Sequence, residues 1–245
     1  MDRNLLSYGL QYACLFIEAV LLLYVAWSSQ RKRQRVVAFY LTSLLVAELT
    51  RAWALQKYGF DSRRYYYAYW STDFLLVISA FLLVCLFFRR ACLREQKMWP
   101  LIRLFLLFVF VLVAGISGLS LFRNRNDFFT YFTIEFNQNL YFTCLVLNTL
   151  LYLLMQQIDS ADDQLGLLVC GVGIQFAGPA ATLALVHLTT GEGFTRSLFY
   201  FTIPLCTLGM LLVWAYAIVR VKDKATEVTR RENPVLAEVT ADLNV

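Results

Sequence analysis

The side chains best suited to chemistry are ionisable or amide groups that stand inside long apolar stretches. They are Glu48, Arg51, Asp73, Glu135 and Asn139. A charge at the centre of a bilayer costs on the order of 2.5–3.5 kcal/mol on insertion scales, so each group is expected to face protein or water and to have a partner. The sequence therefore predicts a ligand- or ion-binding cluster inside a membrane bundle.

Counting along the expected helices places these groups at similar depths. With a rise of ~1.5 Å per residue, Arg51 lies ~22 Å and Asp73 ~21 Å above the more basic edge of a ~30 Å hydrocarbon core. Glu48 lies ~18 Å, Asn139 ~20 Å and Glu135 ~25 Å above the same edge. Because sequential spans run antiparallel, the matched depths predict an ion pair between Arg51 and Asp73. Three carboxylates around one arginine also favour protonated carboxyls, a bound cation or a ligand amine; the alternative is a buried ion pair that only fixes packing.

Aromatic side chains gather at the same end of the spans. Trp53, Tyr66, Tyr69 and Trp70 are the candidates for an aromatic mouth over the polar cluster, suited to a cationic or flat ligand. The alternative is an interfacial belt, since Trp and Tyr are enriched where a membrane meets water.

The composition requires a membrane to surround these groups. Of 245 residues, 59% are hydrophobic and 16% charged, and the charges fall between continuous apolar runs. The fold class predicted is all-α, a polytopic bundle of seven transmembrane helices in residues 1–221, with a short disordered tail in 222–245. The expected spans are Leu5–Trp27, Val36–Leu55, Tyr67–Phe88, Leu101–Phe122, Phe132–Met155, Leu165–Leu188 and Leu198–Val219.

Basic residues between the spans predict the orientation. One side of the membrane would hold 14 of them and the other side 7. Since Lys and Arg are enriched on the cytoplasmic side, we expect the amino terminus outside and the carboxyl terminus in the cytoplasm. The expected location is a bacterial inner membrane, and the same charges are not read as a nucleic-acid footprint.

The sixth span differs from the others in its small residues. Gly173, Ala177 and Ala181 recur at every fourth position, which predicts a close-packing face and a central packing helix. Pro179 in this span and Pro204 in the seventh predict kinks.

The loop before the sixth span carries acidic residues. Ser160 is expected to cap the helix, with Asp163 at the third helical position.

Several catalytic classes lack their motifs. The single histidine excludes a bis-histidine haem and an HExxH zinc site, and no GxSxG elbow or Gly-rich phosphate loop is present. We therefore expect no enzyme activity, no metal and no cofactor.

The segment RYYYAYWSTDFLL and the seven-span layout carry two resemblances. The layout is similar to that of rhodopsins and G-protein-coupled receptors, but the seventh span, LFYFTIPLCTLGMLLVWAYAIV, contains no lysine for a retinal Schiff base. The YAYW segment leading into a long span resembles uncharacterised short seven-helix integral membrane proteins of environmental bacteria such as Acidobacteria. That resemblance covers the first three spans and implies no particular chemistry.

The expected function is that of a sensor-like or small-ligand-binding membrane protein that acts through protein partners. One alternative is a small transporter coupled to protons or cations. Another is a structural subunit of a larger membrane complex.

Overall fold

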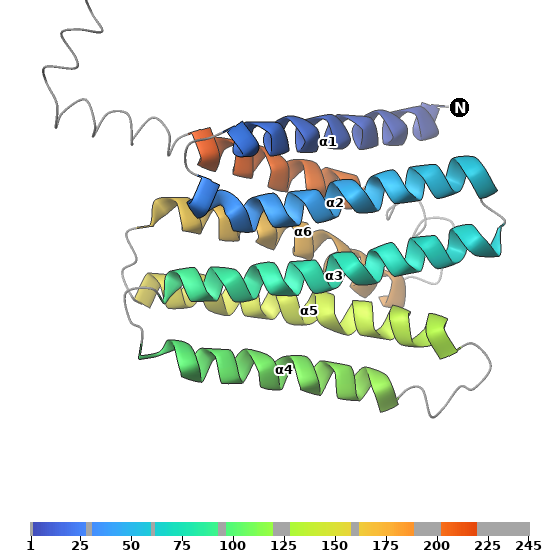
Figure 1. Cartoon of the computed structure of the whole chain (residues 1–245). Coiled ribbons are helices and arrows are strands. Elements are labelled where there is room, and N and C mark those ends of the chain that lie inside the picture. The colour runs from blue at the N-terminus through green and yellow to red at the C-terminus, as the bar shows by residue number, and fades with distance from the viewer. Residues whose placement is uncertain are drawn as a thin grey trace, which may run out of the picture.

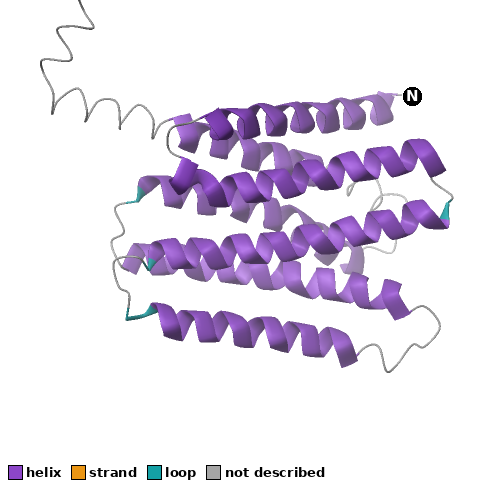
Figure 2. Ribbon diagram, viewed as in Figure 1, coloured by secondary structure: helices purple, strands orange, loops and turns teal. Residues whose placement is uncertain are grey.

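The described part of the chain folds into seven helices (Figure 1). The computed structural model describes residues 2–27, 31–59, 62–92, 97–119, 128–157, 162–188 and 202–219. The helices are α1 (Asp2–Trp27), α2 (Arg31–Tyr58), α3 (Arg63–Ala91), α4 (Trp99–Leu119), α5 (Phe128–Gln157), α6 (Asp163–Leu188) and a last helix, Thr202–Val219. Figure 2 shows no strand in the described part of the chain. The all-α class is confirmed, and every expected span overlaps one helix.

Six of these helices are long and apolar enough to cross a bilayer. They are α1 to α5 and Thr202–Val219, and α6, 26 residues long, adds the apolar stretch Asp163–Gly178 within the residues whose side chains are described. Length and composition therefore support a multi-pass membrane protein. The expected disordered tail, 222–245, lies outside the described residues.

Local signals explain where the described helices begin and end. Gly59 follows α2 with a φ of 74°, a left-handed conformation that glycine adopts without steric cost, and its N–H donates to Leu55. Ser62 caps α3 by accepting a hydrogen bond from the N–H of Arg64. At α6 the cap is Asp162, whose Oδ1 accepts from Leu165 N–H at 3.3 Å. The expected cap Ser160 lies outside the described residues.

The helices lie side by side, and α3 is the central one. It contacts α2, α4, α5 and α6, and half of its span is buried, against 17% of the α4 span. In Figure 1, α1 and α4 lie at opposite edges of the bundle. The prediction that the sixth span is the central helix is therefore wrong, because α3 has more helix neighbours.

The close contacts of α6 use other small residues than those predicted. A Cβ on Gly171 would lie 2.7 Å from Trp214 Cδ1, and a Cβ on Gly178 would collide with Cys206. These two glycines, two helical turns apart, let the last helix approach α6, whereas Ala177 and Ala181 are exposed. The predicted Gly173–Ala177–Ala181 face is therefore not a packing face in the bundle, although Gly173 meets Asn148 of α5.

The two prolines lie at different places in their helices. Pro204 lies two residues after the described part of the Thr202–Val219 helix begins, so the turn that precedes it lies outside the described residues. Pro179 lies inside α6, which continues as helix to Leu188.

Candidate functional site

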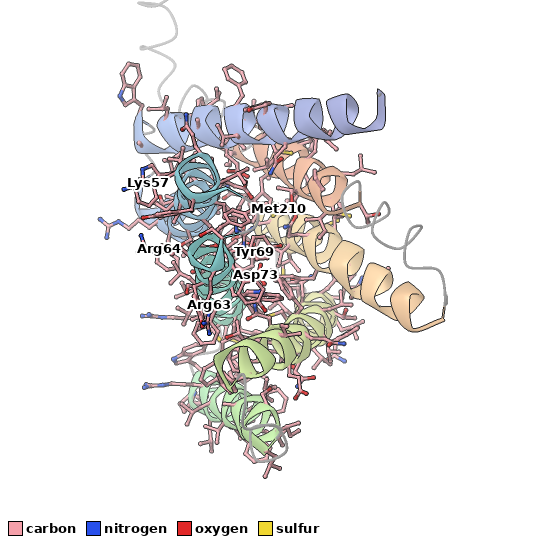
Figure 3. The ribbon with its side chains drawn as sticks, turned by 90° about the vertical axis from the view of Figure 1, so that its right-hand side faces the viewer. Lys57, Arg63, Arg64, Tyr69, Asp73 and Met210 are labelled. Atoms are coloured by element: carbon pink, nitrogen blue, oxygen red, sulfur yellow. The ribbon has the colours of Figure 1, made fainter. Side chains whose placement is uncertain are left out.

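An arginine of α2 forms an ion pair with a carboxylate of α3. Arg51 Nη2 donates to Asp73 Oδ1 at 3.0 Å, and the two side chains are 17% and 20% exposed. The predicted pair between Arg51 and Asp73 is therefore present. Figure 3, viewed toward this end of the bundle, shows Tyr69 and Asp73 between the ribbons.

Neighbouring groups complete the hydrogen bonding of the pair. Arg51 Nε donates to Thr72 Oγ1 at 2.9 Å, and the guanidinium carbon lies 4.5 Å from the centre of the Tyr69 ring. Asn137 of α5 donates from Nδ2 to Asp73 Oδ2 at 2.7 Å. Both carboxylate oxygens of Asp73 thus have a donor, and three helices, α2, α3 and α5, meet at this point.

Glu48 is the second carboxylate beside Arg51, and it is held loosely. Its Oε1 lies 3.9 Å from Arg51 Nη1, which is an ion pair but too long for a hydrogen bond. Its Oε2 accepts from Gln11 Nε2 of α1 at 3.4 Å, and 28% of its side chain is exposed. We call the set Glu48, Arg51, Thr72, Asp73 and Asn137 the Arg51 network.

Two of the predicted site residues lie elsewhere. Asn139 donates to Ser117 Oγ of α4 at 3.1 Å, and Glu135, one turn earlier, has no hydrogen bond or ion pair with the described residues. Both side chains stand on a different face of α5 from Asn137. The depths of Asn139 and Glu135 in the membrane match that of Arg51, but both residues lie on a face of α5 that points away from Arg51.

The aromatic candidates separate into two groups. Tyr66 and Tyr69 each meet Trp70 edge-to-face, with ring centroids 6.0 and 5.7 Å apart. Trp53 instead contacts Tyr58, and Lys57 Nζ lies 4.8 Å from the centre of the Trp53 ring. The structure thus brings three of the four predicted residues together and leaves Trp53 in a separate aromatic group.

Three polar partners were not predicted: Gln11, Thr72 and Asn137. Asn137 carried a readable signal, because it shares a helical face of α5 with Leu140, Cys144 and Leu147, all buried. A polar residue in such an apolar stripe is expected to point at a neighbouring helix. Gln11 and Thr72 carry no comparable signal in the sequence.

The Arg51 network has more negative than positive charge. One arginine faces two carboxylates, Glu48 is only loosely bound, and Asn137 Oδ1 is buried without a hydrogen-bond partner. A ligand that brings a positive charge and N–H donors would complement these oxygens.

Comparisons with protein-family models, with curated proteins and with solved structures find no match. The function proposed below therefore rests on the geometry of the Arg51 network.

Proposed function

We propose that this chain is a multi-pass membrane protein that binds a small cationic ligand at the Arg51 network, in a sensor-like role exerted through protein partners. The observation that carries the proposal is the excess of two carboxylates over one guanidinium, with Glu48 loosely held and Asn137 Oδ1 without a hydrogen-bond partner among the described residues. In this proposal the chain lies in a bacterial inner membrane with its amino terminus outside. It needs no cofactor and is not an enzyme.

Glu48 is the group to which a ligand amine would bind. An amine on its exposed side would form a charge-assisted hydrogen bond, which is stronger than the 3.4 Å bond from Gln11. The rings of Tyr66 and Trp70 lie on α3 at the same end of the bundle, and neither has a cation over its face among the described residues. An amine attached to an aromatic ring therefore suits both features.

Binding would act on the contact between α1 and α2. Gln11–Glu48 is a polar bond between these two helices, and a ligand that takes Glu48 from Gln11 favours arrangements in which α1 has shifted. A ligand moves such an equilibrium only through its different affinity for the two arrangements. A shift of α1 is the signal that a membrane partner could detect.

The test compares phenethylamine with its neutral analogue 2-phenylethanol on the purified protein. We expect the amine to raise the melting temperature and the alcohol to leave it unchanged, with ~2.7 kcal/mol of stabilisation at one hundred times Kd. Glu48→Gln should abolish the difference. Glu135→Gln, which removes a carboxylate outside the network, is the matched control and should keep it.

Equal shifts with the amine and the alcohol would show that no cationic site exists. A difference that survives in Glu48→Gln would place the site elsewhere.

A proton-coupled transporter is the second candidate function. The observation that favours it is a further carboxyl group, Glu18 of α1, which is buried deeper in the bundle than Glu48.

A further inference from the structure

Glu18 is a carboxyl group buried within the first candidate membrane span. It lies nine residues before the end of α1 at Trp27, is 2% exposed, and its Oε2 has no hydrogen-bond partner among the described residues. An ionised carboxylate in such a place requires a cation or several donors, because both water and polar lipid headgroups are out of reach.

The groups around Glu18 supply no positive charge. From α2, Tyr40 and Glu48 interact with it electrostatically, and Cys14 does so from its own helix. The last helix, which approaches α1 where Cys14 Sγ donates to the Pro204 carbonyl at 3.4 Å, has no charged residue between Thr202 and Val219. These neighbours are neutral or negative, so none of them can neutralise a carboxylate.

Of the basic residues in the α2 span, Arg51 is the one nearest its middle, and it is already engaged. Arg51 donates to Thr72 and Asp73, and its contact with Glu48 is 3.9 Å. No ion pair joins Glu18 to a Lys or Arg of the described residues. The remaining way to bury this carboxyl is to protonate it.

We propose that Glu18 is a proton-binding site that is occupied at neutral pH and exchanges its proton with water at the Glu48 end of the bundle. Gln11, Cys14 and Glu18 recur at helical spacing on α1, and Gln11 bonds Glu48, so polar groups lead from the exposed carboxylate to the buried one. The step is a simple protonation: the Glu18 carboxylate accepts a proton from water, and returns it to water when the pH rises. It goes beyond the proposed ligand site and does not depend on it.

Infrared spectroscopy of the protein in lipid vesicles tests the proposal. A protonated carboxyl gives a carbonyl band that a carboxylate lacks. We expect such a band at neutral pH, lost in Glu18→Gln, shifted in Glu18→Asp and retained in Glu135→Gln, a control that removes a carboxylate outside both the Arg51 network and the path to Glu18. Raising the pH from about 5 to about 10, across the range in which buried acids titrate, should remove it.

Two outcomes overturn the proposal. If no band depends on residue 18, the group is ionised and its partner has been missed. If the band persists throughout the pH range, Glu18 is a fixed acid that only packs, and no proton exchange occurs. Glu18→Asp keeps the test decisive should Glu18→Gln not fold.

Dicyclohexylcarbodiimide gives an independent readout, because it reacts with protonated carboxyls in apolar surroundings. We expect one adduct by intact mass, located on Glu18 by peptide mapping, that forms more slowly as the pH rises. Adduct formation at an unchanged rate in Glu18→Gln would contradict the assignment. If the protein does not bind phenethylamine but still forms this adduct, only the proposed ligand site is wrong.

Discussion

Arg51 joins α2 to α3 by using each part of its guanidinium differently. Nε reaches Thr72, Nη2 reaches Asp73, and the flat face lies over the Tyr69 ring. Lysine could not replace it, because an ammonium group offers neither the planar fork nor the stacking face. The arrangement compensates in part for the cost of removing both charges from water, since Arg51 Nε and Nη2 and both carboxylate oxygens of Asp73 have hydrogen-bond partners.

The Arg51–Asp73 pair predicts non-additive stability. Arg51→Gln and Asp73→Asn should each destabilise the detergent-solubilised protein, because either change leaves one charge without its partner. Breaking a fully buried pair costs roughly 3–5 kcal/mol, and we expect less here because about a fifth of each side chain is exposed. The double substitution should recover part of the loss in a thermal or denaturant unfolding experiment. Strictly additive effects would mean that the two side chains do not stabilise each other.

The two asparagines of α5 provide a matched comparison. Asn137→Ala removes a 2.7 Å bond to a carboxylate and should cost roughly 1.5–3 kcal/mol of unfolding free energy. Asn139→Ala removes a neutral bond to Ser117, and bonds of that kind between membrane helices average about 0.6 kcal/mol. Unfolding of both variants under the same conditions measures the difference. A larger loss of unfolding free energy in Asn139→Ala than in Asn137→Ala would show that the charge-assisted bond to Asp73 is not the stronger of the two.

The sequence predicts the partner of Arg51 but not the rest of its surroundings, and the reason is geometric. Residue counting gives the depth of a side chain in the membrane, and Arg51 and Asp73 could be paired on depth alone. It does not give the direction of a side chain around its helix relative to a neighbour. Asn139 and Glu135 have suitable depths, yet Asn139 bonds α4, while Asn137, two residues earlier, reaches Asp73.

At the scale of elements, α6 is held by two side-chain donors from its neighbours. Asn148 of α5 donates to the Val169 carbonyl at 3.1 Å, and Trp214 of the last helix donates to the Leu168 carbonyl at 3.0 Å. The two acceptor carbonyls, of Leu168 and Val169, are consecutive, so α5 and the last helix both donate hydrogen bonds to the same turn of α6. Gly171 lies beside this turn, where the Trp214 indole leaves no room for a side chain.

Gly171→Ala should therefore separate α6 from the last helix. Its Cβ would lie 2.7 Å from Trp214 Cδ1, and overpacking of this kind costs roughly 1–3 kcal/mol. Gly115→Ala in α4 is the control, because a Cβ there meets nothing within 4 Å and alanine is the better helix former. The melting temperature should fall in the first variant and stay level or rise in the second. A level melting temperature in both would show that the Trp214 indole can move aside without cost.

The spacing of small residues could not select this face in advance. Gly173, Ala177 and Ala181 fit the small-residue pattern of packed membrane helices, and Gly171 and Gly178 fit an equally regular spacing of two turns. Which face meets a neighbour depends on where the other helices lie. Ala177 and Ala181 are exposed because no described helix covers that side of α6.

At the scale of the molecule, polar contacts concentrate toward the two ends of the bundle. The Arg51 network joins α2, α3 and α5 toward one end, and Arg90 of α3 bonds Asp162 and Gln164 of the α6 start toward the other. Between them the core is mostly apolar, and Glu18 is the buried carboxyl of that middle layer. Large apolar side chains on the outer side of α4 are exposed, as expected of a surface that meets lipid.

The last prediction concerns how many times the chain crosses the membrane. Six helices satisfy the length and hydropathy of a span, and α6, which is 26 residues long with no Asp, Glu, Lys or Arg after Asp163, would be the seventh crossing. Seven crossings put the termini on opposite sides, whereas six put them on the same side. Basic residues favour a cytoplasmic carboxyl terminus by 14 to 7, and that split assumes seven crossings.

We expect a cytoplasm-specific reporter to be active after Val219 and a periplasm-specific one to be active between α6 and the last helix. A reporter in the loop between α3 and α4 is the control, since its side is the same under both counts. If fusions on both sides of Thr202–Val219 report the same compartment, that helix does not cross the membrane. If the fusion in the α5–α6 loop and the fusion between α6 and the last helix report the same compartment, α6 does not cross the membrane.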